Sequence, residues 1–395
     1  MEQSQGKLQS VYGALEFSSV FIGVLKKPLF TAFEKYVSAV GLEKRQAYAN
    51  FVAEIYKEGG DLTALVQKLI FEDENVYVKS VARKEKIHRC IVDSAERELD
   101  AFSAFGALAS TDFAEDLGVK ESELPLFSSK LVDMRSAYKK RLAGIYKYGY
   151  GIFSGHCMFR LSDEKEIEPI VSTDKVGFDC FIGYEKEREQ IVQNTRALVE
   201  GRPSANALLC GDAGTGKSST VKAVANAFFK DGVRLIELRK DQLKYLPLVM
   251  AKVSGNPLKF IIFIDDLAFN RSDDNFSMLK ASLEGSASAK AENAVIYATS
   301  NRRHIIKESF SDRDGDDVHR NDTLQETLSL SERFGLVVLF QKPNKALYLE
   351  IVKELAKKNG VTMETNELET KAEAFALKRG SRSARCAEQF IDSLL

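Results

Sequence analysis

The stretch Gly211-Asp-Ala-Gly-Thr-Gly-Lys217-Ser218 decides the fold of this chain. It matches the pattern GxxxxGK[ST], follows the apolar run Ala207–Cys210 and precedes a helix-length segment from Ser218 to Phe229. Glycines let the backbone wrap closely around a phosphate, so that successive N–H groups point at its oxygens. The sequence therefore predicts a strand, a phosphate-binding loop and a helix in this order, with the N-terminus of the helix at the phosphate.

The residues of this loop have expected roles in nucleotide binding. We expect Lys217 to reach the β- and γ-phosphates and the Ser218 hydroxyl to ligate Mg²⁺. ATP and Mg²⁺ are therefore the expected ligands. The rest of the loop is expected to surround the phosphates: Gly211, Asp212, Ala213, Gly214, Thr215, Gly216 and Ser219.

Two carboxylates follow a second apolar run, Phe260–Ile264. We expect Asp265 to hold Mg²⁺ through water, and Asp266 to orient or deprotonate the attacking water. Glutamate is the commoner residue at the second position. Because aspartate is one methylene shorter, we expect the water to lie closer to the strand.

Further along the chain, Asn301 ends the next apolar segment, where its amide is expected to hydrogen-bond both the γ-phosphate and the attacking water. Arg333 lies immediately before the run Leu336–Phe340, and we expect it to enter a neighbouring subunit's site and stabilise transition-state charge. The pair Ile182-Gly183 is expected to pack on the adenine.

Two arginines open the last helical segment, Arg382 and Arg385. One of them is expected to contact the γ-phosphate and couple the tilt of a small helical lid to the nucleotide state. Because Arg382 lies in the first turn after Gly380, it is the favoured residue, with Arg385 as the alternative.

Short apolar runs alternate with helix-length segments after residue 180, which is typical of a parallel sheet covered by helices. This pattern predicts an α/β fold, a P-loop core with a five-stranded parallel sheet between helices. The expected strands are Ala207–Cys210, Val233–Leu238, Phe260–Ile264, Ala294–Ala298 and Leu336–Phe340.

The segments on either side of this core are expected to be helical. Apolar residues at helical spacing predict a first helix carrying Phe33, Tyr36, Val37 and Val40, and Asp61 is a good N-cap for a later one. The expected domains are an α-helical N-terminal accessory domain at 1–160, a linker at 161–180, an ATPase core at 181–342 and a C-terminal helical lid at 343–395.

The composition narrows the classes of protein that need to be considered. The chain has 395 residues, with 56 Lys and Arg against 57 Asp and Glu, so bulk charge does not favour nucleic-acid or membrane binding. Its apolar runs are too short to span a bilayer. Five widely spaced cysteines indicate thiols in a reducing compartment, so a cytoplasmic protein is expected. The basic segment Lys130–Lys147, followed by aromatic residues, leaves single-stranded nucleic acid as a less favoured partner.

In their order and spacing these motifs resemble the AAA+ ATPases over residues 175–395. More narrowly, seven segments are similar to a bacterial AAA+ family described as a domain of unknown function (DUF815). They are FIGYEKE from 181, GTGKSSTVKAV from 214, FIDDLAF from 263, LKASLEG from 279, ATSNRRH from 298, LSLSERFGL from 328 and RGSRSAR from 379.

The resemblance implies ATP binding and hydrolysis without implying a substrate. The first functional hypothesis is therefore a homo-oligomeric Mg²⁺-ATPase, with Arg333 acting in trans, that remodels an unknown protein client or an assembly. The paired Asp265-Asp266 also resembles replication initiators and helicase loaders of the AAA+ class. The alternative hypothesis is therefore a nucleotide-dependent loader or switch that binds nucleic acid.

Overall fold

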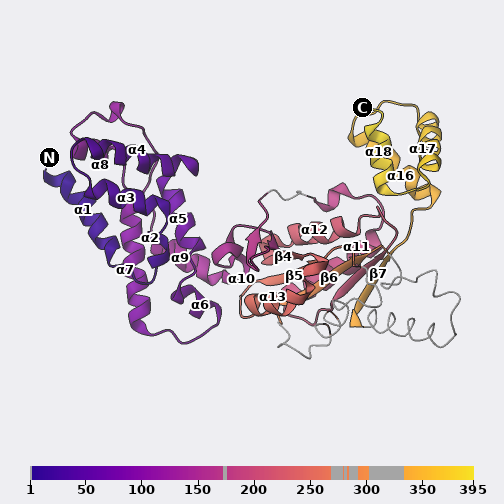
Figure 1. Cartoon of the computed structure of the whole chain (residues 1–395), viewed down its shortest axis with the longest axis horizontal. Coiled ribbons are helices and arrows are strands. Elements are labelled where there is room, and N and C mark those ends of the chain that lie inside the picture. The colour runs from indigo at the N-terminus through magenta and orange to yellow at the C-terminus, as the bar shows by residue number, and fades with distance from the viewer. Residues whose placement is uncertain (1, 172–175, 268–278, 280–282, 284–291, 302–332) are drawn as a thin grey trace. The chain divides into compact units, whose positions relative to one another are not determined.

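The computed structural model describes residues 2–171, 176–267, 279, 283, 292–301 and 333–395. The chain divides into two compact units, Met1–Gly155 and His156–Leu395. Figure 1 shows the first unit as helices coloured indigo to purple, and the second as a sheet with helices. Among the described residues, none of the helices has the length and apolar character that a membrane crossing requires.

The first unit is helical and has an aromatic core. Rings of Phe33, Phe51, Phe105 and Phe113 contact one another with centroids 4.8–6.3 Å apart. Its helices are α1 (Glu2–Glu16), α2 (Ile22–Leu25), α3 (Pro28–Ser38), α4 (Leu42–Lys57), α5 (Leu62–Glu72), α6 (Val76–Ala82), α7 (Arg89–Gly106), α8 (Ser110–Leu117), α9 (Met134–Ala143) and α10 (Ile145–Tyr148), with 3-10 turns η1 (Glu121–Glu123) and η2 (Gly151–Ser154).

The predicted helical stripe is correct in part. Phe33 and Tyr36 are buried, but Val40 is 77% exposed. Helix α3 ends at Ser38 and the next residue is extended, so Val40 leaves the helical register. The predicted N-cap is confirmed, because the Asp61 carboxylate accepts a hydrogen bond from the backbone N–H of Ala64 at 2.9 Å.

In its described residues, the second unit is built on a seven-stranded sheet in the order β2-β1-β4-β5-β6-β3-β7. The α/β fold with a parallel core is confirmed, and β3, which leads into the phosphate loop, lies between β6 and β7. The strands are β1 (Met158–Leu161), β2 (Ile167–Pro169), β3 (Ala207–Gly211), β4 (Val233–Leu238), β5 (Lys259–Ile264), β6 (Ala294–Ser300) and β7 (Leu336–Phe340).

The sheet differs from the five-stranded expectation at one edge. β1 pairs in parallel with β4, and β2 pairs antiparallel with β1, so part of the segment expected to be a linker at 161–180 belongs to the sheet. Phe159, Leu161 and Ile167 are buried there. Burial of these side chains explains why the segment pairs with the core instead of crossing solvent.

Helices lie on both sides of the sheet. α11 (Glu185–Val199) and α12 (Lys217–Ala227) pack together, and α12 contacts β4 and β6. Figure 1 shows α13 (Leu246–Val253) on the other side of the sheet. The short turns are η3 (Phe178–Cys180), η4 (Phe229–Asp231) and η5 (Lys240–Tyr245).

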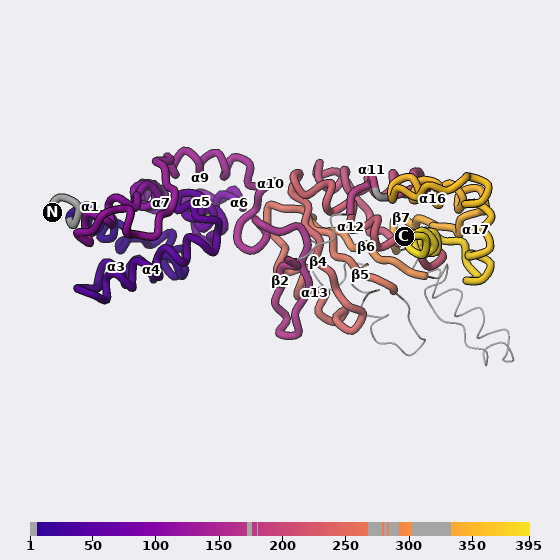
Figure 2. The backbone as a smooth tube through the Cα atoms, turned by 90° about the horizontal axis from the view of Figure 1, so that it is seen from above, coloured from indigo at the N-terminus to yellow at the C-terminus, as the bar shows by residue number. Residues whose placement is uncertain are grey.

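The C-terminal residues form a small helical lid with its own core. Its helices are α16 (Lys345–Lys358), α17 (Thr365–Arg379) and α18 (Ala384–Asp392). Tyr348, Val352, Phe390 and Ile391 are buried among them. Figure 2 shows the chain passing from β7 into α16 and α17.

Candidate nucleotide-binding site

The phosphate loop begins at a position that only glycine can occupy. Gly211 has φ +131°, and a Cβ there would collide with the backbone carbonyl of Phe340 in β7. Further along the loop, Gly214 has φ +74° and lies against Ser383 and Arg385 of the lid. The loop therefore needs glycine for its own turn and for the close approach of neighbouring segments.

A cleft of about 460 Å³ opens above this loop. This volume is in the range of small-molecule sites. The cleft is lined by the loop, by the carboxyl ends of β5 and β6, by the segment before α11 and by the lid. Its lining residues are Val176, Phe181, Ile182, Tyr184, Arg188, Ala213, Gly214, Thr215, Gly216, Lys217, Ser218, Ser219, Asp265, Asp266, Thr299, Asn301, Ile351, Leu355, Ala384, Arg385 and Glu388.

Lys217 is 5% exposed and its ammonium group lies within the loop. Nζ donates hydrogen bonds to the carbonyl oxygens of Gly211 at 3.0 Å and Asp212 at 2.7 Å, and to Oδ1 of Asn301 at 3.1 Å. Burial lowers the pKa of Lys217 from its ordinary value, while nearby carboxylates oppose that shift. The amine is therefore held against the backbone of the loop and beside the side chain of Asn301.

The oxygens expected to bind Mg²⁺ lie together. The Ser218 hydroxyl donates to Oδ1 of Asp265 at 2.6 Å, and Asp266 is the next residue. Magnesium is usually held by one or two protein oxygens, with water and phosphate completing its octahedron. Ser218 and Asp265 fit that pattern, because they place two hard oxygen atoms beside a phosphate loop.

Asn301 joins the second carboxylate to the lysine. Its Nδ2 donates to Oδ1 of Asp266 at 2.7 Å, and its Oδ1 accepts the bond from Lys217. One amide thus contacts both the candidate base and the candidate phosphate-binding cation. Its orientation follows from these two partners, since an amide has one accepting and one donating end.

The apolar end of the cleft contains Ile182, as expected for the adenine, together with Phe181, Ile351 and Leu355. Gly183 is not among the lining residues. It has φ +73° and packs beneath Leu347 of α16. Gly183 therefore brings the lid close to the segment before α11.

Sequence reasoning missed two charged residues at this end of the cleft, Arg188 and Glu388. The Arg188 guanidinium is 5.2 Å from the centre of the Phe181 ring and pairs with Glu185 at 3.2 Å. Burial raises the pKa of Glu388. Both side chains look like ordinary charges of an amphipathic helix in the sequence. Arg188 lies in α11 and Glu388 in α18, so only the packing of these helices around the cleft reveals them.

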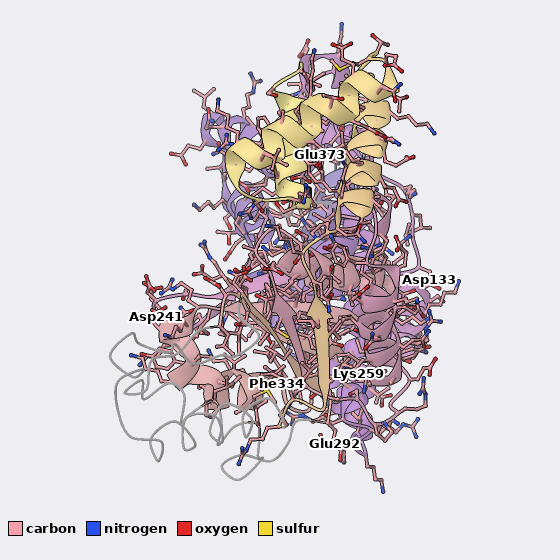
Figure 3. The ribbon with its side chains drawn as sticks, turned by 90° about the vertical axis from the view of Figure 1, so that its right-hand side faces the viewer. Asp133, Asp241, Lys259, Glu292, Phe334 and Glu373 are labelled. Carbon is pink, nitrogen blue, oxygen red and sulfur yellow. The ribbon has the colours of Figure 1, made fainter. Side chains whose placement is uncertain are left out.

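The structure does not bring Arg382 to the cleft. Its guanidinium pairs with Glu373 of α17, with Nε–Oε1 and Nη2–Oε2 distances of 3.0 and 2.8 Å. Figure 3 labels Glu373 on the lid. Arg385 lines the cleft instead. The reason is that Gly380 ends α17 in the left-handed conformation, while α18 begins after its N-cap Ser383, so the first helical turn contains Arg385.

Arg333 lies away from this chain's own cleft. It precedes the N-terminal end of β7, whereas Phe340, at the other end, pairs with Gly211 of the loop. Figure 3 shows Phe334 at the end of β7 that lies opposite the lid. Residues 328–332 of the same motif, residues 268–269 and 302–304 of two others, and most of the motif at 279–285 lie outside the described residues.

Asp212 faces the connection between core and lid. Its Oδ2 accepts a hydrogen bond from the backbone N–H of Lys342 at 3.0 Å. The Tyr184 hydroxyl donates to the neighbouring carbonyl of Gln341 at 2.6 Å. The segment that leads from β7 into the lid is thus held by one residue of the phosphate loop and one residue before α11.

A family model described as "Protein of unknown function (DUF815)" matches residues 155–395. The chain belongs to this family. The match begins where the second unit begins and includes the sheet, the cleft and the lid. It confirms the narrower of the two family resemblances seen in the sequence.

Solved structures give distant matches. The RuvB Holliday junction branch migration motor of Thermotoga maritima has 14% identity and a TM-score of 0.35, covering 55% of this chain and 72% of its own. The HORMA:CdnC:Trip13 complex of E. coli MS115-1 has 13% identity and a TM-score of 0.37, covering 55% and 90%. No curated protein matches the chain.

Proposed function

We propose that this protein is an ATPase that binds Mg²⁺-ATP in the cleft above residues 211–219. The observation that carries the proposal is one continuous series of hydrogen bonds at the carboxyl ends of three strands. It links Lys217, Asn301, Asp266, Asp265 and Ser218 in this order. A phosphate loop beside two carboxylates and an amide is a constellation suited to phosphoryl transfer to water.

Each of these residues would have a separate role in ATP hydrolysis. Lys217 would exchange its carbonyl partners for the terminal phosphates and offset their charge. Asp266, oriented by the Asn301 amide, would accept a hydrogen bond from the attacking water and take its proton. Mg²⁺, held by Ser218 and through water by Asp265, would supply further charge neutralisation at the phosphates.

The lid is proposed to sense the nucleotide through Arg385. The Cβ of Arg385 lies against Gly214 of the phosphate loop, and the residue lines the cleft. A guanidinium there can bind phosphate oxygens with two parallel hydrogen bonds. Because Arg385 belongs to α18, its bond to the nucleotide would couple lid position to phosphate occupancy.

We further propose a cytoplasmic homo-oligomer in which ATP turnover remodels a protein client or an assembly. Arg333 lies just before the N-terminal end of β7, whereas the cleft is at the carboxyl ends of the strands, which supports a role in a neighbouring subunit's site rather than its own. The helical unit Met1–Gly155, of which all but the last residue lies outside the family match, is the proposed region for binding a client.

The basic segment before residue 150 gives little support to nucleic-acid binding. Lys139 pairs with Glu96 at 2.7 Å, and Arg135 pairs with the same carboxylate at 3.2 Å and with Asp100. Arg141 lies over the ring of Phe71, 4.8 Å from its centre. These cations already have partners within the unit, which favours remodelling of a protein over loading on nucleic acid.

The proposal is tested by steady-state ATP hydrolysis of the purified protein. We expect Mg²⁺-dependent release of phosphate, loss of nucleotide binding in Lys217→Ala, and retained binding with slow turnover in Asp266→Asn, since that change removes the base and keeps the size. Absence of turnover at every protein concentration, with Lys217→Ala indistinguishable from the wild type, would contradict the ATPase assignment.

A further inference from the structure

The end of β6 places a threonine against the two carboxylates. In the parallel pairing of β5 and β6, Ile264 lies opposite Ala298, so Asp265 and Thr299 follow at the next level. Thr299 is 1% exposed overall and lines the cleft. Its position is therefore fixed by the sheet rather than by a loop.

Thr299 makes three hydrogen bonds to three consecutive residues. Its hydroxyl donates to Oδ1 of Asp265 at 2.5 Å and accepts from the backbone N–H of Asp266 at 3.0 Å. Its carbonyl oxygen accepts from the backbone N–H of Leu267 at 2.7 Å. The hydroxyl thus uses its donor on the Asp265 carboxylate and an acceptor position on the backbone of Asp266.

These bonds distinguish the two oxygens of Asp265, of which one would be available to a metal ion. Oδ1 already accepts from Ser218, Thr299 and the N–H of Asp266, at 2.6, 2.5 and 3.1 Å. Among the described residues, no donor reaches Oδ2. A carboxylate fixed by one oxygen presents the other in a defined direction, as ligands oriented by an outer partner commonly do.

The same hydroxyl supports a strained turn. Asp266 has φ +51°, a left-handed conformation that is unusual for a residue other than glycine. The hydrogen bond from its N–H to Thr299 holds that conformation and so aims its carboxylate toward Asn301. Strain of this kind persists where surrounding contacts hold it, and it is concentrated at functional sites.

We propose that Thr299 is a positioning residue for the catalytic carboxylates, an inference that rests on the proposed ATPase function. Its hydroxyl orients Asp265 for Mg²⁺ and fixes the backbone turn that aims Asp266 at water. Asn301, two residues further on, acts on the side chain of Asp266, so the end of β6 supports both carboxylates by separate contacts.

The variant Thr299→Val tests the hydroxyl, because it keeps the branched shape and removes the hydrogen bonds. We expect kcat for ATP to fall by about 10- to 100-fold with KM changed much less, and the Mg²⁺ concentration that half-saturates ATP binding to rise about tenfold. Thr299→Ser, which keeps the hydroxyl, should restore most of both values.

A matched control lies on the same strand. Tyr297→Phe removes a buried hydroxyl that contacts Thr195 at 2.8 Å and Asn194 at 3.0 Å, away from the carboxylates. This variant should lower the stability of the second unit to unfolding, without changing kcat or the Mg²⁺ dependence of ATP binding. Thermal unfolding of all three variants separates loss of fold from loss of positioning.

The outcomes separate this inference from the proposed function. Wild-type kcat and Mg²⁺ dependence in Thr299→Val, or equal losses in the Val and Ser variants, would overturn the positioning role. If the wild type binds Mg²⁺-ATP without hydrolysing it, the ATPase proposal fails, and the Mg²⁺ titration of ATP binding still tests Thr299. Failure of the wild type to bind ATP with Mg²⁺ would overturn both.

Discussion

At the scale of the residue, the candidate site combines side chains of the phosphate loop with side chains that follow β5 and end β6. Lys217, Ser218, Asp265 and Asp266 follow from a glycine-rich loop and an apolar strand, and the structure brings these residues together. Thr299 has no such signal, because a buried threonine in a strand is ordinary. Its importance depends on the register between β5 and β6, which is a tertiary property.

We expect substitution of the two lid arginines to have different effects on ATP binding and turnover. We expect Arg385→Ala to weaken ATP binding or turnover by about tenfold or more, because it removes a cation that lines the cleft. Arg382→Ala is the matched control, since it removes only the pair with Glu373 on the lid surface. Titration of ATP binding and steady-state kinetics measure both effects. Equal effects of the two substitutions would contradict the proposed contact between Arg385 and the nucleotide.

At the scale of the element, the spacing of apolar residues predicted those strands and helix ends that depend on the local sequence. Val233–Leu238 and Leu336–Phe340 are strands with the expected bounds, and Asp61 caps α5 as expected. The strands β1 and β2 were missed because they have only four and three residues, too few to show a strand pattern. β1 forms by pairing with β4, far along the chain, and β2 then pairs with β1, so their place in the sheet depends on tertiary structure.

The turn between α1 and α2 depends on one buried carboxylate of α7. Glu98 is 5% exposed and accepts hydrogen bonds from the backbone N–H groups of Ser19, Val20 and Phe21 at 2.9, 3.0 and 2.8 Å. Glu98→Gln places an amide donor against these donors and should destabilise the helical unit by about 1–3 kcal/mol. Hydrogen exchange of the full chain should show faster exchange at residues 18–22.

A control for this change lies two residues away on the same helix. Glu96 faces the surface cations Arg135 and Lys139, whose contribution to stability is expected to be small. Glu96→Gln should therefore leave exchange at residues 18–22 unchanged. Similar exchange in the wild type and in Glu98→Gln would argue that the turn is held by packing alone.

At the scale of the whole molecule, the position of Arg333 predicts that activity depends on assembly. Arg333→Ala should bind ATP normally and hydrolyse it about a thousandfold more slowly, and specific activity of the wild type should rise with protein concentration. Mixing Arg333→Ala with Lys217→Ala should recover part of the activity. In such a mixed assembly one variant supplies the arginine and the other supplies an intact nucleotide site.

The necessary control is a mixture of Arg333→Ala with a protein that carries both substitutions, which should show no recovery. Phosphate release across a range of mixing ratios gives the measurement. Hydrolysis by Arg333→Ala at the wild-type rate, at all concentrations, would place this arginine outside catalysis.

The short edge strand has a consequence for the behaviour of the chain in concentrated solution. β2 has three residues, ends in Pro169 and runs antiparallel to β1. Proline lacks an N–H group, so this border offers few donors to an incoming strand. Another polypeptide cannot readily extend the sheet there, and the parallel core is shielded on that side from edge-to-edge aggregation.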